Sequence, residues 1–549
     1  MSESESTTLI DEIRTDYSFD EPSLELGAAV ADGTAHPDAV VRIPLGVLNR
    51  HGLVAGATGT GKTKTLQLMA EQLVEQGVPV FLADVKGDLS GMATPGTANE
   101  RIDARMQDVG LTWEPTAYPV EFYALGGQGT GVPVRAAVST FGPTLLAKVL
   151  GLNATQESSL GLVFHYADKH GLYLDTIADL RAVVQHLTSE EGKADLKELG
   201  GLSSATAGVI LRELIAFSDQ GADAFFGLPE LDTSHFLRTA EDGRGILSML
   251  ELPAVRDRPQ LFSTFLMWLL ADLFHDLPEV GDPDKPKLVF FFDEAHLLFD
   301  GASKDFQDAI EQTVRLIRSK GVGIFFVTQS PKDVPPDVLG QLGNRVQHAL
   351  RAFTPDDAKA LRAAVKTYPH TAYDLEELLT SLGTGEAVVT VLSEKGAPTP
   401  VAWTRMRAPE SSMDPSPEET VAAAVAASPL MAEYGEAQER DSALEMLDKA
   451  SVERVKAEEA AAAAKARAEA DAAAAEEAEK ARVAAEKAAE KERLAAEKAA
   501  AKEEARKAKE PGMVEQVVKS SAFRSMLRSA GTVIGREITR SVFGTSKRR

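Results

Sequence analysis

A glycine-rich stretch at residues 56–63 carries the residue types that bind phosphate groups. It reads Gly56, Ala57, Thr58, Gly59, Thr60, Gly61, Lys62, Thr63. Glycines let a backbone wrap around phosphates and direct its N–H groups at them, and the N-terminus of a following helix adds positive potential. Lys62 is expected to reach the outer phosphates, and the Thr63 hydroxyl is expected to ligate Mg2+. Together with the adjacent Lys64, the stretch predicts a site for ATP; a glycine turn without a ligand is the weaker alternative.

An apolar run that ends in two carboxylates is the second chemical signal. The run Leu288–Phe292 is followed directly by Asp293 and Glu294. A buried strand would deliver both acids to its exposed end, where Asp293 could hold Mg2+ through its oxygen or through a bound water. Glu294 could accept a proton from the attacking water or orient that water. Taken alone, such a strand end is also compatible with a structural role.

A third apolar run, residues 324–328, ends at Gln329. An amide at this place could sense the γ-phosphate of a nucleotide and relay its loss, whereas an isolated Gln would be an ordinary strand cap. The order of the three motifs along the chain favours the functional interpretation. His51 and His296 flank the motifs, but no further His or carboxylate repeats at zinc-ligand spacing, so no metal other than magnesium is expected.

The elements around these motifs predict an α/β fold. Strands alternate with helices along residues 46–89 and again along residues 286–410, and this rhythm is typical of a mainly parallel sheet covered by helices. Between them, residues 90–285 form a largely helical insertion that ends in a strand near residues 245–252 and a helix around Trp268. The motifs should therefore meet where the strands end.

Composition limits the classes of protein. Cysteine is absent, which excludes disulfides, thiolate zinc sites and cysteine nucleophiles. The net charge of -25 argues against a broadly basic surface that coats nucleic acid, although a local basic channel stays open. No secretory signal is visible, and the apolar stretch at residues 262–274 is too short to span a bilayer. A cytoplasmic location is the expectation.

Shifts in composition divide the chain into five expected parts. These are a leader and strand module (1–45), the main domain with its insertion (46–410), a linker (411–449), an Ala/Glu/Lys-rich helix (450–510) and a basic amphipathic tail (511–549). Ala at nearly all apolar positions of the helix disfavours a tightly packed coiled coil and favours a solvated spacer or a weak self-association element. The tail either docks back on the main domain or binds anionic lipid or nucleic acid.

The strings GATGTGKT, FFFDEAH and RSKGVGIFFVTQSP, in this order, resemble the HerA-FtsK superfamily over roughly residues 45–405. The resemblance implies a RecA-like P-loop NTPase fold and a hexameric ring that uses ATP and Mg2+ to translocate double-stranded DNA. A two-lobed RNA helicase is disfavoured despite the DEAH string, because no later arginine-rich helicase motif is present. An ABC-type ATPase is disfavoured because LSGGQ is missing.

The same resemblance suggests further site residues. In that family, one arginine before the glycine-rich strand and another before the GVG-type strand reach the nucleotide of a neighbouring subunit, and Arg50 and Arg318 occupy matching places. Arg315 and Arg345 are weaker candidates, and a surface salt bridge is the alternative for each arginine. Relatives also place residues near the nucleotide at the strand end that carries Asp84, Lys86 and Asp88, where a solvated strand end is the alternative. Lys304 and Lys332 could face the pore of a ring.

Two functions are consistent with these observations. The first is an ATP-hydrolysing motor that moves a polymer, with double-stranded DNA as the first candidate. The second is an ATP-gated interaction protein, in which the C-terminal helix and basic tail recruit a membrane surface or a protein partner and slow hydrolysis acts as a timer.

Overall fold

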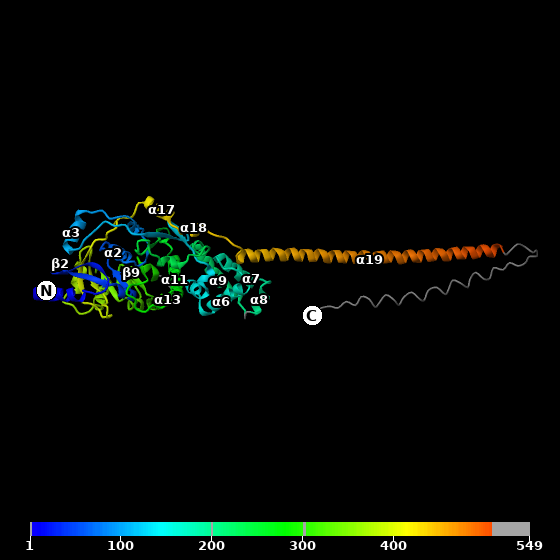
Figure 1. The fold of residues 1–549 in the computed structure, drawn as a ribbon. Helices are drawn as coiled ribbons and strands as arrows, with labels where there is room; N and C mark the ends of the chain where they lie inside the picture. Colours follow the sequence, from blue (N-terminus) through cyan, green and yellow to red (C-terminus); the bar gives the residue numbers. More distant parts are fainter. Residues whose placement is uncertain (1–2, 199–200, 300–303, 508–549) are drawn as a thin grey trace, which may run out of the picture. The chain divides into compact units, whose positions relative to one another are not determined.

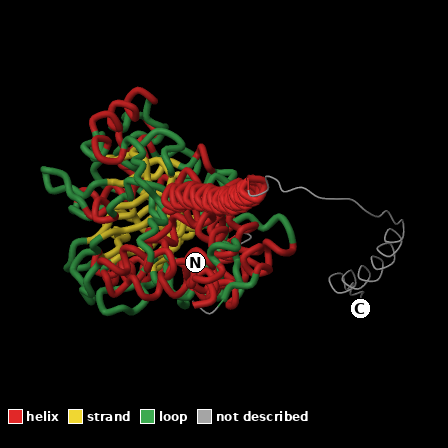
Figure 2. Tube along the Cα trace, turned by 90° about the vertical axis from the view of Figure 1, so that its right-hand side faces the viewer, coloured by secondary structure: helices red, strands yellow, loops and turns green. Residues whose placement is uncertain are grey.

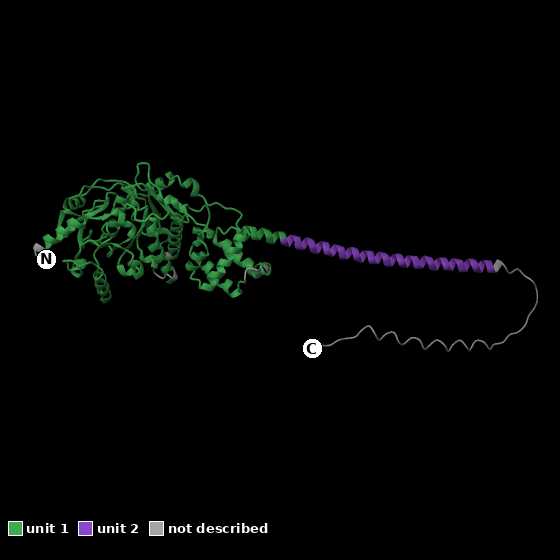
Figure 3. Cartoon of the chain, turned by 60° about the horizontal axis from the view of Figure 1, so that its bottom comes forward, with its two compact units in different colours: residues 1–453 green, residues 454–549 purple. Residues whose placement is uncertain are grey.

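The computed structural model describes residues 3–198, 201–299 and 304–507. The chain divides into two compact units, residues 1–453 and residues 454–549 (Figure 3). The first unit contains a twelve-stranded sheet with the order β2-β1-β12-β11-β10-β3-β9-β8-β4-β7-β5-β6. The strands are β1 Ser23–Ala31, β2 Thr34–Pro44, β3 Gly52–Ala55, β4 Val80–Asp84, β5 Val120–Leu125, β6 Val132–Val134, β7 Leu247–Glu251, β8 Leu288–Phe292, β9 Val322–Thr328, β10 Asn344–Gln347, β11 Glu386–Thr390 and β12 Ala402–Met406.

The sheet is parallel from β10 to β6 and antiparallel from β2 to β10. In the parallel part, β3 lies between β10 and β9, and β8 lies between β9 and β4. Parallel strands end at the same edge of a sheet, so the segments that follow β3, β8, β9 and β4 meet at one carboxyl edge. This edge brings the three sequence motifs together.

Alternating side chains of the central strands enter two different cores. In β8, Phe290 and Phe292 belong to one buried cluster, whereas Val289 and Phe291 belong to the other. Successive side chains of a strand point to opposite faces, so a strand that is covered on both faces is apolar throughout. Figure 2 shows the strands with helices on both sides.

Helix α2 (Lys62–Glu75) covers one face of the central strands, and most of its residues are buried. The other face is covered by α11 (Pro259–Asp276) and α13 (Lys304–Ile317), beside a group of helices from the predicted insertion (Figure 1). The helices between β4 and α11 are α3 Glu100–Val109, α4 Val138–Phe141, α5 Pro143–Val149, α6 Ala154–Lys169, α7 Ile177–Thr188, α8 Lys193–Glu198, α9 Ser204–Asp219 and α10 Ala222–Phe225. This region also supplies β5, β6 and β7 to the main sheet; only β7 was expected.

The N-terminal residues form a helix and two strands of the same sheet. Helix α1 (Glu3–Asp16) buries Leu9, Ile10 and Ile13 against the core, at a spacing that suits one face of a helix. The sequence predicts a polar leader for this segment and no helix, so α1 was not predicted. Strand β1 then pairs with β2 on one side and β12 on the other.

The remaining α-helices come after β8 in the chain. They are α12 His296–Phe299, α14 Pro336–Leu339, α15 Pro355–Val365, α16 Leu375–Ser381, α17 Glu418–Ala427, α18 Met431–Tyr434 and α19 Ala443–Lys507. Helix α19 has 65 residues and would be roughly 100 Å long at 1.5 Å per residue. Ion pairs such as Lys480–Glu476 lie along it one turn apart. In the described part of the chain, no helix is long and apolar enough to cross a membrane.

The predicted fold class is confirmed: the chain is an α/β protein of the RecA-like P-loop type, with a mainly parallel sheet, a helical insertion and a long C-terminal Ala/Glu/Lys helix. The apolar run at residues 288–292 matches β8, and the apolar run at residues 324–328 lies within β9, which begins two residues earlier. The domain boundaries stay a proposal. The expected basic tail at residues 511–549 lies outside the described residues.

Candidate nucleotide site

The glycine-rich stretch forms a loop between β3 and the first turn of α2. The backbone N–H of Gly56 donates to the Thr328 carbonyl at 3.2 Å, and that of Ala57 donates to the Ala349 carbonyl at 2.8 Å. Gly61 has a φ of 115°, in the left-handed region that favours glycine. A Cβ added at Gly56 would lie 2.5 Å from the Cβ of His348, so only glycine fits there. The loop is therefore held by the ends of both neighbouring strands, β9 and β10.

Lys62 lies within this loop. Its side chain is buried, with an exposed fraction of 7%, and its Nζ donates to the Ala57 carbonyl at 3.2 Å. Burial lowers the pKa of Lys62, while the negative charges of Glu294 and Asp293 oppose that shift. The amine and the two acids of the second motif are thus electrostatically coupled across more than two hundred residues of sequence.

Asp293 is the first residue after β8 and is almost fully buried, with an exposed fraction of 1%. Burial raises its pKa to about 7, and the neighbouring charge of Glu294 adds to the shift, although the ammonium of Lys86 opposes it. Its Oδ2 has no hydrogen-bond partner among the described residues, and the nearest cation is the Nζ of Lys86 at 4.0 Å. A buried carboxylate oxygen without a donor suits a metal ligand, since a divalent cation would supply the missing positive charge.

Glu294 follows with a φ of 49°, which is uncommon for a residue with a side chain. Its Oε1 forms an ion pair with the Nζ of Lys86, and its Oε2 lies 3.2 Å from the Nδ1 of His296. Burial alone would raise its pKa, but the hydrogen bond from Lys86, the charges of Lys86 and His296 and a contact with Gln329 lower it. Gln329, the end of the third motif, therefore reaches the acid of the second.

Lys86 stands on a short loop after β4. The carboxylate of Asp84 fixes this loop by accepting the N–H groups of Lys86, Gly87 and Leu89 at 3.1, 2.7 and 2.8 Å. Asp84 is therefore a structural anchor. The expected position of Lys86 near the nucleotide site agrees with the geometry; its direct pairing with Glu294 could not be read from the sequence.

His348 is a site residue that the sequence motifs did not indicate. It follows β10 and is fully buried behind the phosphate loop. One ring nitrogen, Nδ1, lies 2.8 Å from the Glu386 carbonyl, and the other, Nε2, lies 2.9 Å from the Thr65 hydroxyl. A neutral ring that donates from Nδ1 and accepts at Nε2 satisfies both contacts, and burial lowers its pKa to about 4. Only the parallel pairing of β10 with β3 could have revealed it.

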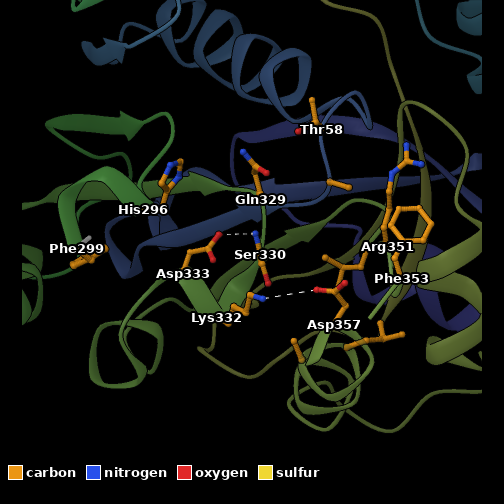
Figure 4. Close-up of a pocket in the computed structure, with 14 residues that line it drawn as sticks. Thr58, His296, Phe299, Gln329, Ser330, Lys332, Asp333, Arg351, Phe353 and Asp357 are labelled. Atoms are coloured by element: carbon orange, nitrogen blue, oxygen red, sulfur yellow. Dashed lines mark hydrogen bonds and ion pairs between the residues drawn. The ribbon is translucent and has the colours of Figure 1, made fainter. Parts of the chain in front are cut away.

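A cavity of about 890 Å³ opens beside the phosphate loop. Figure 4 shows Thr58, His296 and Gln329 on one side of it and Arg351, Phe353 and Asp357 on another. Lys332, an expected pore residue, also lines it and lies 3.9 Å from an oxygen of Asp357. The cavity provides space beside Ala57 and Thr58 of the glycine-rich loop and beside Gln329. The second expected pore residue, Lys304, begins α13.

Two further residues of the predicted phosphate loop, Thr63 and Lys64, differ in their surroundings. Thr63 lies partly exposed in the first turn of α2. The amine of Lys64 does not join the acids, because it donates to the Met413 carbonyl and to Gln67 Oε1. Lys64, Gln67 and the buried Glu71 all bind residues 410–413, which cross the outer side of α2. Only the backbone of Lys64 remains a candidate for the nucleotide.

The two expected trans-acting arginines lie at the opposite edge of the sheet. Arg50 precedes β3 and Arg318 precedes β9, and both point to Asp282, at 3.7 and 3.3 Å. Their strands end at the phosphate loop and at Gln329, so neither guanidinium is placed near the nucleotide site of its own chain. His51 is structural: its Nδ1 accepts the Ile324 N–H at 3.1 Å and its Nε2 contacts the Val314 carbonyl at 2.7 Å.

The weaker candidates have local partners. Arg315 lies 3.9 Å from Glu311 on the same exposed helix face, and Arg345 donates to the Thr367 hydroxyl at 2.6 Å. Asp88 has a buried Oδ1 with no hydrogen-bond partner among the described residues and contributes to the field around Lys86. No group of three or more His, Cys, Asp or Glu side chains is arranged to hold a metal ion in the described ranges.

Comparison with known proteins relates this site to DNA-repair helicases. The chain is 23% identical over 356 residues to the DNA double-strand break repair helicase HerA of Sulfolobus acidocaldarius, a match that covers 64% of each chain. It is 22% identical over 375 residues to the protein of the same name from Sulfurisphaera tokodaii, covering 68% of this chain and 67% of the relative. The chain thus spans 64% of the length of the first of these relatives.

Among solved structures, the plasmid coupling protein TrwB in complex with the non-hydrolysable ATP analogue ADPNP is similar, with a TM-score of 0.48 and 14% identity over 73% of this chain and 98% of that chain. The family described as Helicase HerA-like C-terminal matches residues 30–549, a range that includes all three motifs. The resemblance to the HerA-FtsK superfamily is therefore confirmed, and the chain belongs to the HerA-like helicase C-terminal family.

Proposed function

We propose that this chain is a Mg2+-dependent ATPase motor that assembles into a ring, hexameric as in the HerA-FtsK superfamily, and moves double-stranded DNA. The single observation that carries the proposal is that Lys62, Asp293, Glu294 and Gln329 all follow the ends of the adjacent parallel strands β3, β8 and β9. The family membership and the names of the HerA relatives support the DNA substrate.

Each side chain has a task in this proposal. The N–H groups of the glycine-rich loop and the ammonium of Lys62 bind the triphosphate, while Thr63 and Asp293 hold Mg2+, which neutralises phosphate charge when bound. Glu294 orients the attacking water and accepts its proton. Gln329, which lies near Glu294, senses the loss of the γ-phosphate. Its movement then changes the position of the segment that carries Lys332.

The position of the two arginines supports a ring. Arg50 and Arg318 lie at the amino edge of strands whose carboxyl edge carries the nucleotide site, a separation of about 13 Å or more for a strand of four residues. They could therefore serve only the nucleotide of a neighbouring copy. The Nε of Arg50 is buried without a hydrogen-bond partner among the described residues. A guanidinium from a neighbour would make hydrolysis depend on assembly.

The direct test measures ATP hydrolysis with double-stranded DNA, single-stranded DNA, RNA and no polymer, while particle mass is recorded with and without nucleotide. Double-stranded DNA should stimulate turnover of the assembled protein, and Lys62→Ala and Glu294→Gln should abolish it. If DNA at physiological salt neither binds the assembled protein nor speeds ATP turnover, the motor proposal fails.

A second candidate is an ATP-gated protein that recruits a membrane surface or a protein partner through its C-terminal residues. The exposure of α19 along residues 456–505 favours it, because a helix of this length with no packed face in the described structure can act as a spacer. Removing residues 454–549 separates the two candidates. A motor should keep DNA-stimulated turnover, whereas a recruiter should lose its partner.

A further inference from the structure

Lys86 is the lysine in direct contact with the acid proposed to activate water. Its Nζ is paired with the Oε1 of Glu294 and lies 4.0 Å from the Oδ2 of Asp293. The side chain of Lys86 is partly exposed, at 44%, whereas that of Glu294 is buried, at 8%. The carboxylate is therefore fixed, and the lysine side chain is the partner that has room to move.

The backbone beneath Lys86 cannot follow such a movement easily. Asp84 holds the N–H groups of Lys86, Gly87 and Leu89, and Gly87 adopts a φ of 76° that favours glycine. Loop and strand thus present the lysine from a rigid base. Any change at this contact must come from rotation of the four-carbon side chain itself, which is flexible.

The contact opposes the role proposed for Glu294. A carboxylate that orients and deprotonates water must direct an oxygen with its negative charge at that water. In the structure, the ammonium of Lys86 neutralises this charge and holds Oε1 toward the loop after β4. His296, 3.2 Å from Oε2, limits rotation of the same carboxylate from the other side.

We propose that Lys86 is a restraining residue that holds Glu294 in an ion pair, and that a bound triphosphate, which also attracts the lysine ammonium, loosens this hold only in part. This inference rests on the proposed ATPase function. The site without nucleotide contains two lysines, Lys62 and Lys86, and two acids, Asp293 and Glu294, and the two like-charged lysines repel each other. A bound triphosphate adds negative charge beside both ammonium groups, which weakens the hold of Glu294 on Lys86. Turnover without a polymer is therefore slowed by the fraction of ATP-bound sites in which the ion pair persists.

The test compares steady-state ATP hydrolysis of the full chain with Lys86→Met and Lys86→Gln, in the absence of any polymer. Release of Glu294 should raise kcat at least about threefold with KM for ATP within about twofold, since a positioned base contributes much more than this when fully effective. Lys86→Arg, which keeps the positive charge, should stay near the original rate. The exposed Lys366→Met serves as a matched control and should change neither parameter.

Dependence on Glu294 is tested with the double variant Lys86→Met, Glu294→Gln, which should be as inactive as Glu294→Gln alone. A structural defect would lower activity, so a gain in kcat distinguishes restraint from simple support of the fold. If kcat stays unchanged or falls in both Lys86→Met and Lys86→Gln, the restraint is wrong. If Lys62→Ala and Glu294→Gln keep full turnover, the proposed ATPase function itself is wrong, which is a separate result.

Discussion

The two edges of the central parallel sheet differ in how their charged groups are satisfied. At the carboxyl edge, Asp293 is buried and its Oδ2 has no donor in the described structure, and Lys62 is buried against a single carbonyl. At the amino edge, His51 has both ring nitrogens in contact, and Arg50 and Arg318 share the exposed Asp282. The carboxyl edge thus has a buried carboxylate oxygen and a buried ammonium that suit a ligand, whereas the amino edge has two guanidinium groups that share one exposed acid. One edge is suited to chemistry and the other to a neighbour.

The largest effect is expected at the carboxyl edge. Lys62→Ala should lower kcat for ATP hydrolysis by about 10²-fold or more, because a preorganised cation on the transferring phosphate is lost. Thermal unfolding without nucleotide should change little, since the Lys62 amine has one carbonyl partner. A variant that unfolds many degrees earlier and keeps its turnover would reverse the assignment of this edge.

The arginines at the amino edge should affect ATP turnover only when two copies of the chain are in contact. Arg318→Ala should lower turnover by roughly 10-fold to 10³-fold if its guanidinium serves a neighbouring nucleotide. Mixing Arg318→Ala with Lys62→Ala protein should restore activity, because some interfaces then pair an intact Lys62 with an intact Arg318. If the mixture is no more active than the two separate variants, the arginine does not act in trans. Arg50→Ala can be examined in the same way.

Each edge contains one buried neutral histidine, and each histidine should lower the stability of the fold in acid. Burial lowers the pKa of His51 and of His348 to about 4, below the ordinary value near 6.5. A folded-state pKa that is depressed means that the unfolded chain binds protons first, so stability falls as pH drops from about 6.5 to 4, by up to about 3 kcal/mol per histidine. Because the raised pKa of Asp293 acts in the opposite direction, the loss is measured as the difference in urea unfolding between the original chain and histidine variants across this range.

Substitution of each histidine separates its effect on stability from its effect on ATP binding. His51→Gln and His348→Gln should each reduce the dependence of stability on pH, while the exposed His370→Gln should leave it unchanged. ATP binding should weaken in His348→Gln, whose side chain supports Thr65 behind the phosphate loop, but not in His51→Gln. Equal ATP affinity in both variants would show that His348 does not position the loop.

The smallest effect is expected for Arg315. Its partner Glu311 lies 3.9 Å away on the same exposed helix face, and such pairs contribute about 0.5 kcal/mol or less. Arg315→Ala should therefore change the free energy of unfolding by less than that amount and turnover by less than about twofold. A loss comparable to that of Arg318→Ala would add Arg315 to the surface that a neighbour contacts.

Sequence was most informative where one physical rule decides the outcome. The run Leu288–Phe292 is apolar at every position, which identifies a strand buried on both faces, and the acids after it had to lie at the carboxyl edge. The glycine-rich stretch likewise required a loop before a helix. The pairing of β8 with β9 agrees with the expectation that the motifs lie close together at the ends of parallel strands, although the order of strands was not predicted.

Sequence was less informative where a contact depends on chain packing. His348 lies behind the phosphate loop only because β10 pairs with β3, and no motif marks it. Lys86 is an ordinary lysine after a strand until its loop is fixed by Asp84. Lys64 belongs to the motif by position, yet residues 410–413 provide its amine with other partners. The domain boundaries, the cytoplasmic location and the role of the tail stay predictions.

The most direct test of the account is a structure of the chain with Mg2+ and a non-hydrolysable ATP analogue. The Lys62 amine and the Asp293 carboxylate should contact the same magnesium-bound triphosphate, with Glu294 beside its last phosphate. A nucleotide bound elsewhere, or a Lys62 amine distant from both carboxylates with no nucleotide between them, would contradict the account.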